Sequence, residues 1–356
     1  MKIKFLRNYA VTRCRLFLMK LRFCFPAAVL SIPLTLILFW ITGLSDFFFE
    51  LSFDNFKWPP YNIDVQKQVA LELLGYPREI KPVNIWTQFR ILHYPTCKNN
   101  RLTRKRSILV IVKSSPERIN NREAIRSSYA SSIENNILIN NFRFRIVFVM
   151  GKPLDFTLLY NLELENNKFG DLIIGDFIDN YFNNTFKFIH SIGFAKNYCN
   201  NGVVPFVLLL DDDYLFLPWN LEIELEKHIS HERLYMGWRY DSSPFRLRWK
   251  KFKVSISEYP FNAYPPYITA GAVLLSGQTV NEFYFAIQYT EIFIFDDIYA
   301  GILAYLLAIQ VQHNPNFPPY PNFGNKNWWN TTIAAHGYSP NSLLSTYNEI
   351  LKIKKS

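Results

Sequence analysis

The chain has 356 residues, of which 49% are hydrophobic and 17% aromatic, so it can form a large core and its composition excludes wholesale disorder. The formal net charge of +10 is concentrated before residue 23, where seven Lys and Arg residues occur without any acidic residue. These seven charges leave only +3 for the rest of the chain, which is too little to indicate a nucleic-acid-binding protein.

The uncharged segment 23–44, FCFPAAVLSIPLTLILFWITGL, predicts a transmembrane signal anchor. About 20 apolar residues span a bilayer, and prolines are tolerated in such helices. Basic residues precede the segment and the first acidic residue, Asp46, follows it. The positive-inside rule then predicts a cytoplasmic tail of residues 1–22 and a luminal body. A cleaved signal peptide is the alternative, although its basic region would be unusually long.

Two cysteines and two sequons beyond the anchor agree with a luminal body. Cys97 and Cys199 would lie in an oxidising compartment, where we expect one disulfide between them. Two free buried thiols are the alternative. Asn183 (Asn-Asn-Thr) and Asn330 (Asn-Thr-Thr) are glycosylation sequons.

Residues 45–104 lack clear periodicity and are interpreted as a luminal stem, followed by a catalytic domain over residues 105–356. In that domain, apolar runs predict strands at 107–112, 144–150, 172–174 and 207–210, and helices are expected at 118–132, 186–199 and 298–309. Strands that alternate with helices indicate an α/β fold with a mainly parallel central sheet. Small residues in the segment 269–276 predict a close approach of backbone to backbone or to a ligand.

Three consecutive aspartates, Asp211, Asp212 and Asp213, directly follow the buried strand at 207–210. Ligands of open α/β sheets bind at the carboxyl ends of strands. Three adjacent carboxylates repel one another, so we expect a compensating partner, such as a hard divalent cation that also holds a phosphate. Oxygen ligands favour manganese or magnesium, and a luminal site of this kind indicates a nucleotide-sugar. A solvated turn is the alternative.

A reaction at this site also needs a base, and two further motifs carry candidates. Asp296 and Asp297 lie in apolar surroundings, where paired carboxylates separate in pKa and one becomes a suitable base. An ordinary helix N-cap is the alternative. His336 could complete the metal site or be a structural histidine.

Ordered motifs across residues 108–351 resemble the β-1,3-glycosyltransferases that share the galactosyltransferase fold, glycosyltransferase family 31, and in particular the Brainiac-type β-1,3-N-acetylglucosaminyltransferases. The motifs are LVIVKSSPERINNREAIRSSY, RIVFVMG, GDLIIGDFIDNYFNNTFKFI, LLLDDDYLF, WRYDSSPFR, EYPFNAYPPYITAGAVLLS and FDDIYAG. The resemblance implies a GT-A-type nucleotide-sugar-binding fold, a UDP-sugar donor, Mn²⁺ or Mg²⁺, and inversion at the anomeric carbon.

The resemblance also implies roles for individual residues. Asp213 and His336 would hold the metal, and Asp297 would be the base. The implied donor-binding residues are Arg122, Arg126, Asp176, Lys187, Asp211 and Asp212. The chain departs from the family pattern at Tyr129, where Trp is usual, and at Asp296, where Glu is usual.

The expected protein is a single-pass type II Golgi membrane enzyme. It would transfer a sugar, first of all N-acetylglucosamine, from UDP to a galactose or mannose 3-hydroxyl on a glycolipid or glycoprotein. The segment 246–253 interleaves cations with aromatics, which fits a lipid-borne acceptor or else a solvated basic loop. The alternatives are transfer of galactose or N-acetylgalactosamine and an inactive, chaperone-like luminal relative; a membrane-tethered lectin would leave Asp296 and Asp297 unexplained.

Overall fold

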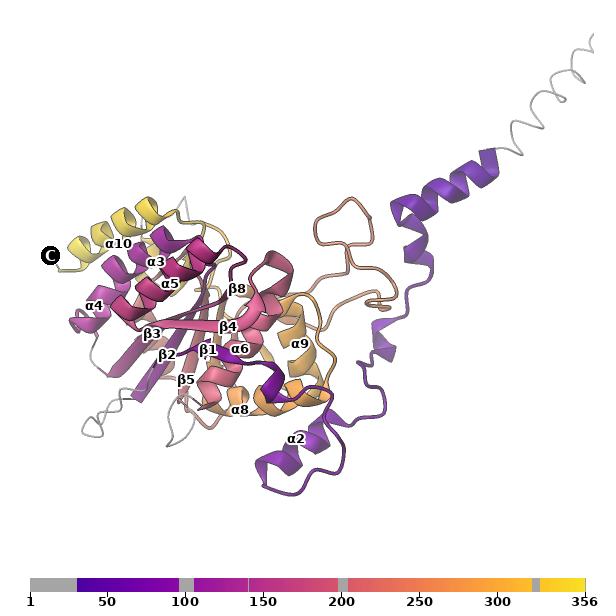
Figure 1. Cartoon of the computed structure of the whole chain (residues 1–356), viewed down its shortest axis with the longest axis horizontal. Helices are drawn as coiled ribbons and strands as arrows, with labels where there is room; N and C mark the ends of the chain where they lie inside the picture. Colours follow the sequence, from indigo (N-terminus) through magenta and orange to yellow (C-terminus); the bar gives the residue numbers. More distant parts are fainter. Residues whose placement is uncertain (1–30, 96–105, 140, 198–203, 322–326, 356) are drawn as a thin grey trace, which may run out of the picture. The chain divides into compact units, whose positions relative to one another are not determined.

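The computed structural model describes residues 31–95, 106–139, 141–197, 204–321 and 327–355 (Figure 1). The chain divides into two compact units. The smaller unit consists of the described part of Met1–Phe56 together with Ser242–Ala263, and the larger unit consists of Lys57–Asp241 together with Tyr264–Ser356. The candidate site lies in the larger unit.

The larger unit is built on one eight-stranded sheet with the order β1-β4-β3-β2-β5-β8-β7-β9. The strands are β1 (Ile91–His93), β2 (Arg106–Lys113), β3 (Phe142–Lys152), β4 (Leu172–Ile178), β5 (Phe206–Asp211), β7 (Tyr235–Tyr240), β8 (Tyr267–Ser276) and β9 (Val311–His313). β2 is parallel to β3 and β5, β3 to β4, and β7 to β9, whereas β1 and β8 pair antiparallel with their neighbours. This mostly parallel, mixed sheet confirms the predicted α/β class.

Helices lie on both sides of this sheet (Figure 1). One side carries α3 (Ile119–Ile125), α4 (Ser131–Glu134), α5 (Phe156–Phe169) and α10 (Pro340–Lys355). The other side carries α6 (Asn184–Asn197), α8 (Gly277–Ala286) and α9 (Asp296–Leu306). Two further helices are α2 (Val65–Leu73), which packs against α8, and α7 (Pro218–Leu225), which follows β6 in the chain.

Burial on both faces explains the apolar runs that predicted the strands. In β2, Val110 and Ile111 point to opposite faces because successive strand residues alternate, and both side chains are fully buried. A strand covered on both faces has no polar side, so it appears in the sequence as a continuous hydrophobic run. The same holds for β5, in which Val207 to Leu210 are all buried.

The strand order reverses between β2 and β5. The chain moves outward from β2 through β3 to β4 and then returns to the other side of β2 as β5. In open α/β sheets, ligands bind at the carboxyl ends of the strands at such a reversal. Lys113 and Asp211 end these two parallel strands and are partners in register. The topology therefore places the aspartate triplet at the expected binding edge.

Two elements differ from the sequence prediction. The helix expected over 118–132 is interrupted, because the π-helical segment η4 (Arg126–Ala130) separates α3 from α4. This segment holds Tyr129 fully buried, with its ring edge-on to Phe216 at 5.5 Å. β4 extends to Ile178, beyond the expected 172–174, because its pairing with β3 continues to Lys152, which lies opposite Ile178.

The predicted tail and most of the predicted anchor lie in residues 1–30, which are outside the described residues. Cys97 and Cys199, the predicted disulfide partners, are also outside them. Residues 31–42, the described part of the anchor, are helical and mostly exposed. No helix in the described part of the chain has both the length and the apolar content needed to cross a membrane. Within the predicted stem, residues 57–95 belong to the larger unit and contribute β1 to the edge of its sheet.

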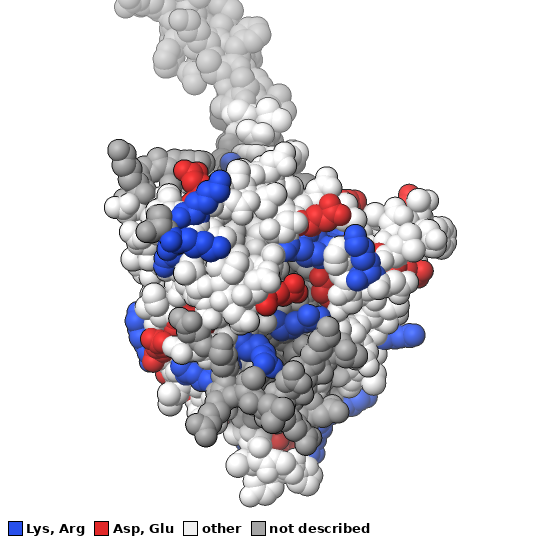
Figure 2. Space-filling model, turned by 90° about the vertical axis from the view of Figure 1, so that its left-hand side faces the viewer, with Lys and Arg blue, Asp and Glu red and all other residues white. Residues whose placement is uncertain are grey.

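Charged side chains are mixed on the face that Figure 2 draws. Lys and Arg alternate there with Asp and Glu, without a continuous field of one sign. A protein that binds a nucleic-acid backbone needs a basic patch or stripe. The face in Figure 2 therefore agrees with the small net charge beyond residue 22.

Candidate active site

A buried lysine joins the aspartate triplet to the second acidic pair. The Nζ atom of Lys113 lies 3.1 Å from Oδ1 of Asp211 and 2.6 Å from Oδ2 of Asp296. Lys113 is only 7% exposed. Three elements, β2, β5 and α9, therefore meet at one ammonium group. This group supplies part of the charge compensation that the triplet requires, and sequence reasoning did not single it out.

The pKa values follow from this burial. Burial disfavours the charged form of Lys113, but the carboxylates of Asp211 and Asp296 outweigh it and raise the lysine pKa. Burial likewise raises the pKa of Asp211 to about 6, and the ammonium of Lys113 opposes that rise. Lys113 is therefore charged at neutral pH, and Asp211 is mainly ionised.

Asp212 is held by two residues that follow β2. Its Oδ2 accepts hydrogen bonds from Oγ of Ser114 at 2.7 Å and from Nε of Arg118 at 3.0 Å. Its Oδ1 lies 2.7 Å from NH2 of Arg118. Asp212 is 4% exposed, and burial raises its pKa while Ser114 and Arg118 oppose the rise. Both carboxylate oxygens are engaged, so its predicted contact with a donor would require an exchange of partners.

A short β-ribbon brings His336 to Asp213. β6 (Tyr214–Phe216) pairs antiparallel with β10 (Ala334–His336), which sets His336 opposite Tyr214. The backbone carbonyl of Asp213 accepts hydrogen bonds from the amides of Gly337 and Tyr338, at 3.1 and 3.0 Å. His336 Nε2 then lies 3.4 Å from Asp213 Oδ2. The two predicted metal ligands are therefore neighbours.

The other oxygen of Asp213 is suited to a cation. Oδ1 is buried and has no hydrogen-bond partner among the described residues. Burial acts against the Asp213 carboxylate, but the hydrogen bond from His336 outweighs it and lowers the Asp213 pKa. The same bond raises the His336 pKa. A divalent cation at Oδ1 would satisfy this oxygen and compete with the proton on His336.

Two protein ligands are enough for such an ion. Magnesium and similar hard cations are usually held by one or two side chains together with substrate phosphates, rather than by a complete protein cage. Among the described residues, no cluster of three or more His, Cys, Asp or Glu side chains could hold a metal. The pair Asp213 and His336 fits a metal that shares its coordination with a diphosphate.

The second acidic pair opens α9. Phe295 occupies the N-cap position and makes no side-chain capping bond, so Asp296 and Asp297 are the first two helical residues rather than the N-cap. Asp296 is buried against Lys113, whereas Asp297 is partly exposed. Burial, and next the charge of Asp296, raise the pKa of Asp297 well above its usual range. A partly exposed carboxylate with a raised pKa is a suitable general base.

The glycine of the segment 269–276, Gly271, packs against Tyr214, the residue after the aspartate triplet. A Cβ atom on Gly271 of β8 would lie 2.1 Å from the hydroxyl oxygen of Tyr214. Only glycine therefore allows the Tyr214 ring to pack against the β8 backbone directly after the triplet. The close approach predicted for this segment is a contact with protein rather than with a ligand.

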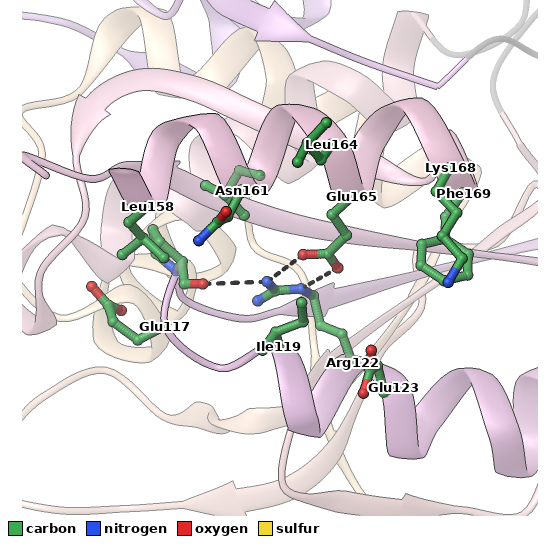
Figure 3. Close-up of a pocket in the computed structure, with 12 residues that line it drawn as sticks. Glu117, Ile119, Arg122, Glu123, Leu158, Asn161, Leu164, Glu165, Lys168 and Phe169 are labelled. Atoms are coloured by element: carbon green, nitrogen blue, oxygen red, sulfur yellow. Dashed lines mark hydrogen bonds and ion pairs between the residues drawn. The ribbon is translucent and has the colours of Figure 1, made fainter. Parts of the chain in front are cut away.

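The two predicted donor-binding arginines form ion pairs with acidic residues outside the triplet, and Arg122 reaches Asp212 only through Ser114, to whose Oγ its NH1 donates at 3.1 Å. Arg122 is fully buried, and its Nε and NH2 lie 2.8 and 2.7 Å from the carboxylate oxygens of Glu165 on α5 (Figure 3). Arg126 lies 2.8 Å from both Glu165 and Asp171. The two arginines and their partners hold α3 and η4 against α5.

The cavity beside Arg122 also lies apart from the aspartates. It measures about 300 Å³ and lies between α3 and α5 (Figure 3). None of the aspartates at 211–213 or 296–297 lines it. The arginine that forms an ion pair with the triplet is Arg118, whereas the sequence predicted Arg122 and Arg126. The donor-binding roles of Arg122 and Arg126 stay predictions.

The remaining predicted residues lie at varied positions. Lys187 is buried, 2.9 Å from Asp179, and donates to the carbonyl of Ser114 at 2.8 Å, so it supports the loop after β2. Asp176 pairs with Lys152 at the surface, 2.6 Å away. Asn183 is half-buried and donates its side-chain amide to a backbone carbonyl, whereas Asn330 is exposed. Their roles in donor binding and glycosylation stay predictions.

Replacing Lys113 with methionine is expected to lower the free energy of unfolding by about 3–5 kcal/mol, since it leaves two buried carboxylates without their partner. Protonation relieves the repulsion between them, so the loss is expected to be smaller at pH 5 than at pH 8. Urea unfolding of the full chain at both pH values measures it. Lys81→Met, at an exposed lysine, is the control. An equal loss at both pH values would contradict the assigned pairing.

Comparison with known proteins decides the family. The Galactosyltransferase family model matches residues 120–315, more than half of the chain. The chain is also 31% identical over 323 residues to β-1,3-galactosyltransferase bre-5 of Caenorhabditis elegans, covering 90% of this chain and 92% of that protein. This chain belongs to the galactosyltransferase family. As a member of that family it is a glycosyltransferase, which confirms the resemblance seen in the motifs.

Other members of the galactosyltransferase family differ in the sugar that their names specify. β-1,3-Galactosyltransferase brn of Drosophila melanogaster is 30% identical over 329 residues, covering 90% of this chain and 94% of that protein. A β-1,3-N-acetylglucosaminyltransferase of Rattus norvegicus is 29% identical over 218 residues, covering 60% and 54%. The solved structure of galactosyltransferase LgtC aligns with a TM-score of 0.33 at 14% identity, covering 69% of this chain and 95% of that chain. The relatives share β-1,3 transfer, not one donor.

Proposed function

We propose that this chain is an inverting β-1,3-glycosyltransferase with a GT-A-type fold. It transfers a sugar from a UDP-sugar to the 3-hydroxyl of a galactose or mannose on a glycolipid or glycoprotein. The observation that carries the proposal is that Lys113 joins the aspartate triplet to the acidic pair of α9 through Asp211 and Asp296, at the point where the strand order reverses, while His336 lies beside Asp213 of the same triplet. Membership of the galactosyltransferase family supports it.

Asp213 and His336 would hold the manganese or magnesium ion, which would supply positive charge to the diphosphate of the donor. The free oxygen Oδ1 of Asp213 is the atom available for this contact. Lys113 and Arg118 compensate the negative charges of Asp211 and Asp212. The aspartate triplet at this edge of the sheet therefore repels a diphosphate less strongly. These residues bind and orient the donor before any bond changes.

Asp297 performs the proton transfer. It accepts the proton of the acceptor 3-hydroxyl as that oxygen attacks the anomeric carbon of the donor sugar. The bond between the anomeric carbon and the diphosphate oxygen breaks, UDP leaves with the electron pair, and the configuration inverts. The raised pKa of Asp297 makes it a stronger base than an ordinary aspartate, and its partial exposure leaves it accessible to the acceptor.

We propose two candidate donor sugars in order of preference. The Brainiac-type motifs favour UDP-N-acetylglucosamine as the first donor. Galactose is the second candidate, because two relatives that align over 90% of this chain are named β-1,3-galactosyltransferases. The proposal also places the enzyme in the Golgi membrane as a single-pass type II protein anchored by residues 23–44, with its body in the lumen.

The pH dependence of transfer tests the role of Asp297. The base acts only when it is deprotonated, so kcat/KM is expected to fall as the pH drops through the raised Asp297 pKa. The acidic limb of the profile should therefore lie well above pH ~4, the ordinary range of an aspartate. A limb that remains at the ordinary range would remove Asp297 as the base.

A panel of UDP-sugars tests the function itself. The full chain with Mn²⁺ is incubated with UDP-N-acetylglucosamine, UDP-galactose or UDP-N-acetylgalactosamine and with acceptors that end in galactose or mannose. We expect UDP release that depends on the acceptor with one of these donors. Binding of UDP-sugar without any transfer, or no binding at all, would instead favour the inactive, chaperone-like relative.

A further inference from the structure

A buried arginine ties two distant segments of the smaller unit together. Arg246 is 1% exposed, and its Nε lies 2.7 Å from Oε1 of Glu50. Its other nitrogens donate to the backbone carbonyls of Val254, Ser255 and Phe261, at 3.1, 3.2 and 2.8 Å. A buried charge with this many partners fixes geometry, so the loop that carries Arg246 has a defined position against the segment around residue 50.

The same loop is also joined to the end of the helical segment 31–42. The amide of Arg248 donates to the carbonyl of Thr42 at 3.1 Å, and the Arg248 guanidinium lies 4.8 Å from the centre of the Trp40 ring. Gly43 has a φ of +81°, and a Cβ atom there would lie 2.3 Å from the carbonyl oxygen of Arg246. Glycine is therefore required where the two backbones meet.

The exposed side chains of this joined structure are both aromatic and basic. Its large apolar side chains are 40–76% exposed, and its four cations are exposed beside them. We call it the aromatic-basic surface; it consists of Phe47, Phe48, Phe49, Leu51, Phe245, Trp249 and Phe252 together with Arg248, Lys250, Lys251 and Lys253. The stretch from Phe245 to Val254 contains no acidic residue. Soluble surfaces rarely expose so many large apolar side chains together unless they bind something.

The chemistry of this surface fits the headgroup layer of a bilayer. Aromatic rings favour the boundary between hydrocarbon and water, and Lys and Arg extend their stems over apolar surface while the charged ends reach phosphate groups. The surface is continuous with the exposed apolar segment 31–42, in which Trp40 is 61% exposed. A protein partner would explain the apolar side chains, but it would not by itself explain this continuity.

We propose that the aromatic-basic surface lies on the phospholipid headgroup layer, with its rings at the interface and its cations at lipid phosphates. This contact is separate from the proposed sugar transfer. It adds a second point of attachment beside the segment 31–42, and it fixes the distance of the loop 245–253 from the membrane. An enzyme held in this way can act on acceptors that are borne by lipids.

Quenching of Trp249 by brominated lipid tests the proposal. The full chain is incorporated into phosphatidylcholine nanodiscs, either unbrominated or brominated near the headgroup end of the acyl chains. The Trp249 contribution is the difference between the wild type and Trp249→Phe. We expect the brominated lipid to remove most of the Trp249 emission. Equal quenching of the wild type and Trp249→Phe would overturn the proposal, because the lipid contact would then belong to other tryptophans such as Trp40.

Charge variants separate a local contact from a general one. Lys250→Gln, Lys251→Gln and Lys253→Gln, combined in one chain, are expected to reduce quenching of Trp249. The matched control combines Lys81→Gln, Lys168→Gln and Lys352→Gln at exposed lysines of the larger unit and should leave it unchanged. An equal reduction in both triple variants would contradict a local contact. Acrylamide quenching of Trp249 is also measured without lipid at increasing protein concentration. If the protein shields Trp249 more strongly as its concentration rises, the surface binds a second copy of the chain, and the membrane proposal is overturned.

Discussion

Asp297→Asn is expected to lower kcat for sugar transfer by about 10²–10⁴-fold, the usual contribution of a general base. Asparagine has the shape of aspartate but does not accept the proton of the acceptor hydroxyl. The side chain contacts neither Lys113 nor the Asp213–His336 pair in any hydrogen bond or ion pair of the described residues. UDP-sugar binding in the presence of Mn²⁺ should therefore persist, which calorimetry measures alongside steady-state kinetics.

Asp241→Asn is the matched control, since Asp241 is an exposed aspartate paired with Arg239 at the surface. It should leave kcat unchanged. Full activity of Asp297→Asn would remove the proposed base. A loss of donor binding together with activity would instead assign Asp297 to the donor site rather than to proton transfer.

Asp213→Ala is expected to abolish the part of UDP-sugar binding that depends on Mn²⁺, and with it transfer. The substitution removes the carboxylate whose free oxygen is the candidate metal contact. It leaves the Asp213 carbonyl, which accepts the hydrogen bonds from Gly337 and Tyr338, so β6 and β10 should stay paired. Titration of UDP into the full chain, with and without Mn²⁺, measures the effect.

His336→Ala provides a graded comparison. It removes the neutral ligand but keeps the carboxylate, so we expect weaker Mn²⁺-dependent binding rather than none. Far-UV circular dichroism confirms that both variants are folded. Unchanged Mn²⁺-dependent binding in Asp213→Ala would contradict the metal assignment, whatever the outcome for His336→Ala.

The sequence predicted the parts of the fold that depend on local pattern. β2 and β5 are buried on both faces, so their apolar runs were unambiguous, and the acidic triplet had to follow β5 directly. The helix expected over 298–309 corresponds to α9, which begins two residues earlier, at Asp296. The π-helical segment around Tyr129 was not predicted, because the packing that buries this ring comes from Phe216, far along the chain.

The charge pairing of the site could not be predicted, because it depends on contacts between distant residues. Lys113 meets Asp296 across 183 positions of sequence, and only the sheet topology brings β2 and α9 together. Its signal was a lysine at the end of a buried strand. Arg118 lies in the same motif as Arg122, and sequence alone did not show which arginine turns toward the triplet and which toward Glu165.

The sequence context of His336 did not predict a position beside Asp213. Sequence pattern left it as a possible structural histidine, since β10 is only three residues long and too short to detect. The pairing of β10 with β6 places it beside Asp213. Only the family resemblance predicted His336 as a metal ligand. The order of the motifs thus identified a role that the residue's own sequence context did not indicate.

The anomeric configuration and linkage of the product test the central claim most directly. The product formed by the full chain from UDP-sugar and acceptor is purified and its proton and carbon spectra are recorded by nuclear magnetic resonance. A single Asp297 base that activates the acceptor hydroxyl, with direct departure of UDP, predicts a β-anomer linked to position 3. A product that retains the α-configuration of the donor, or one linked elsewhere, would contradict the proposed mechanism.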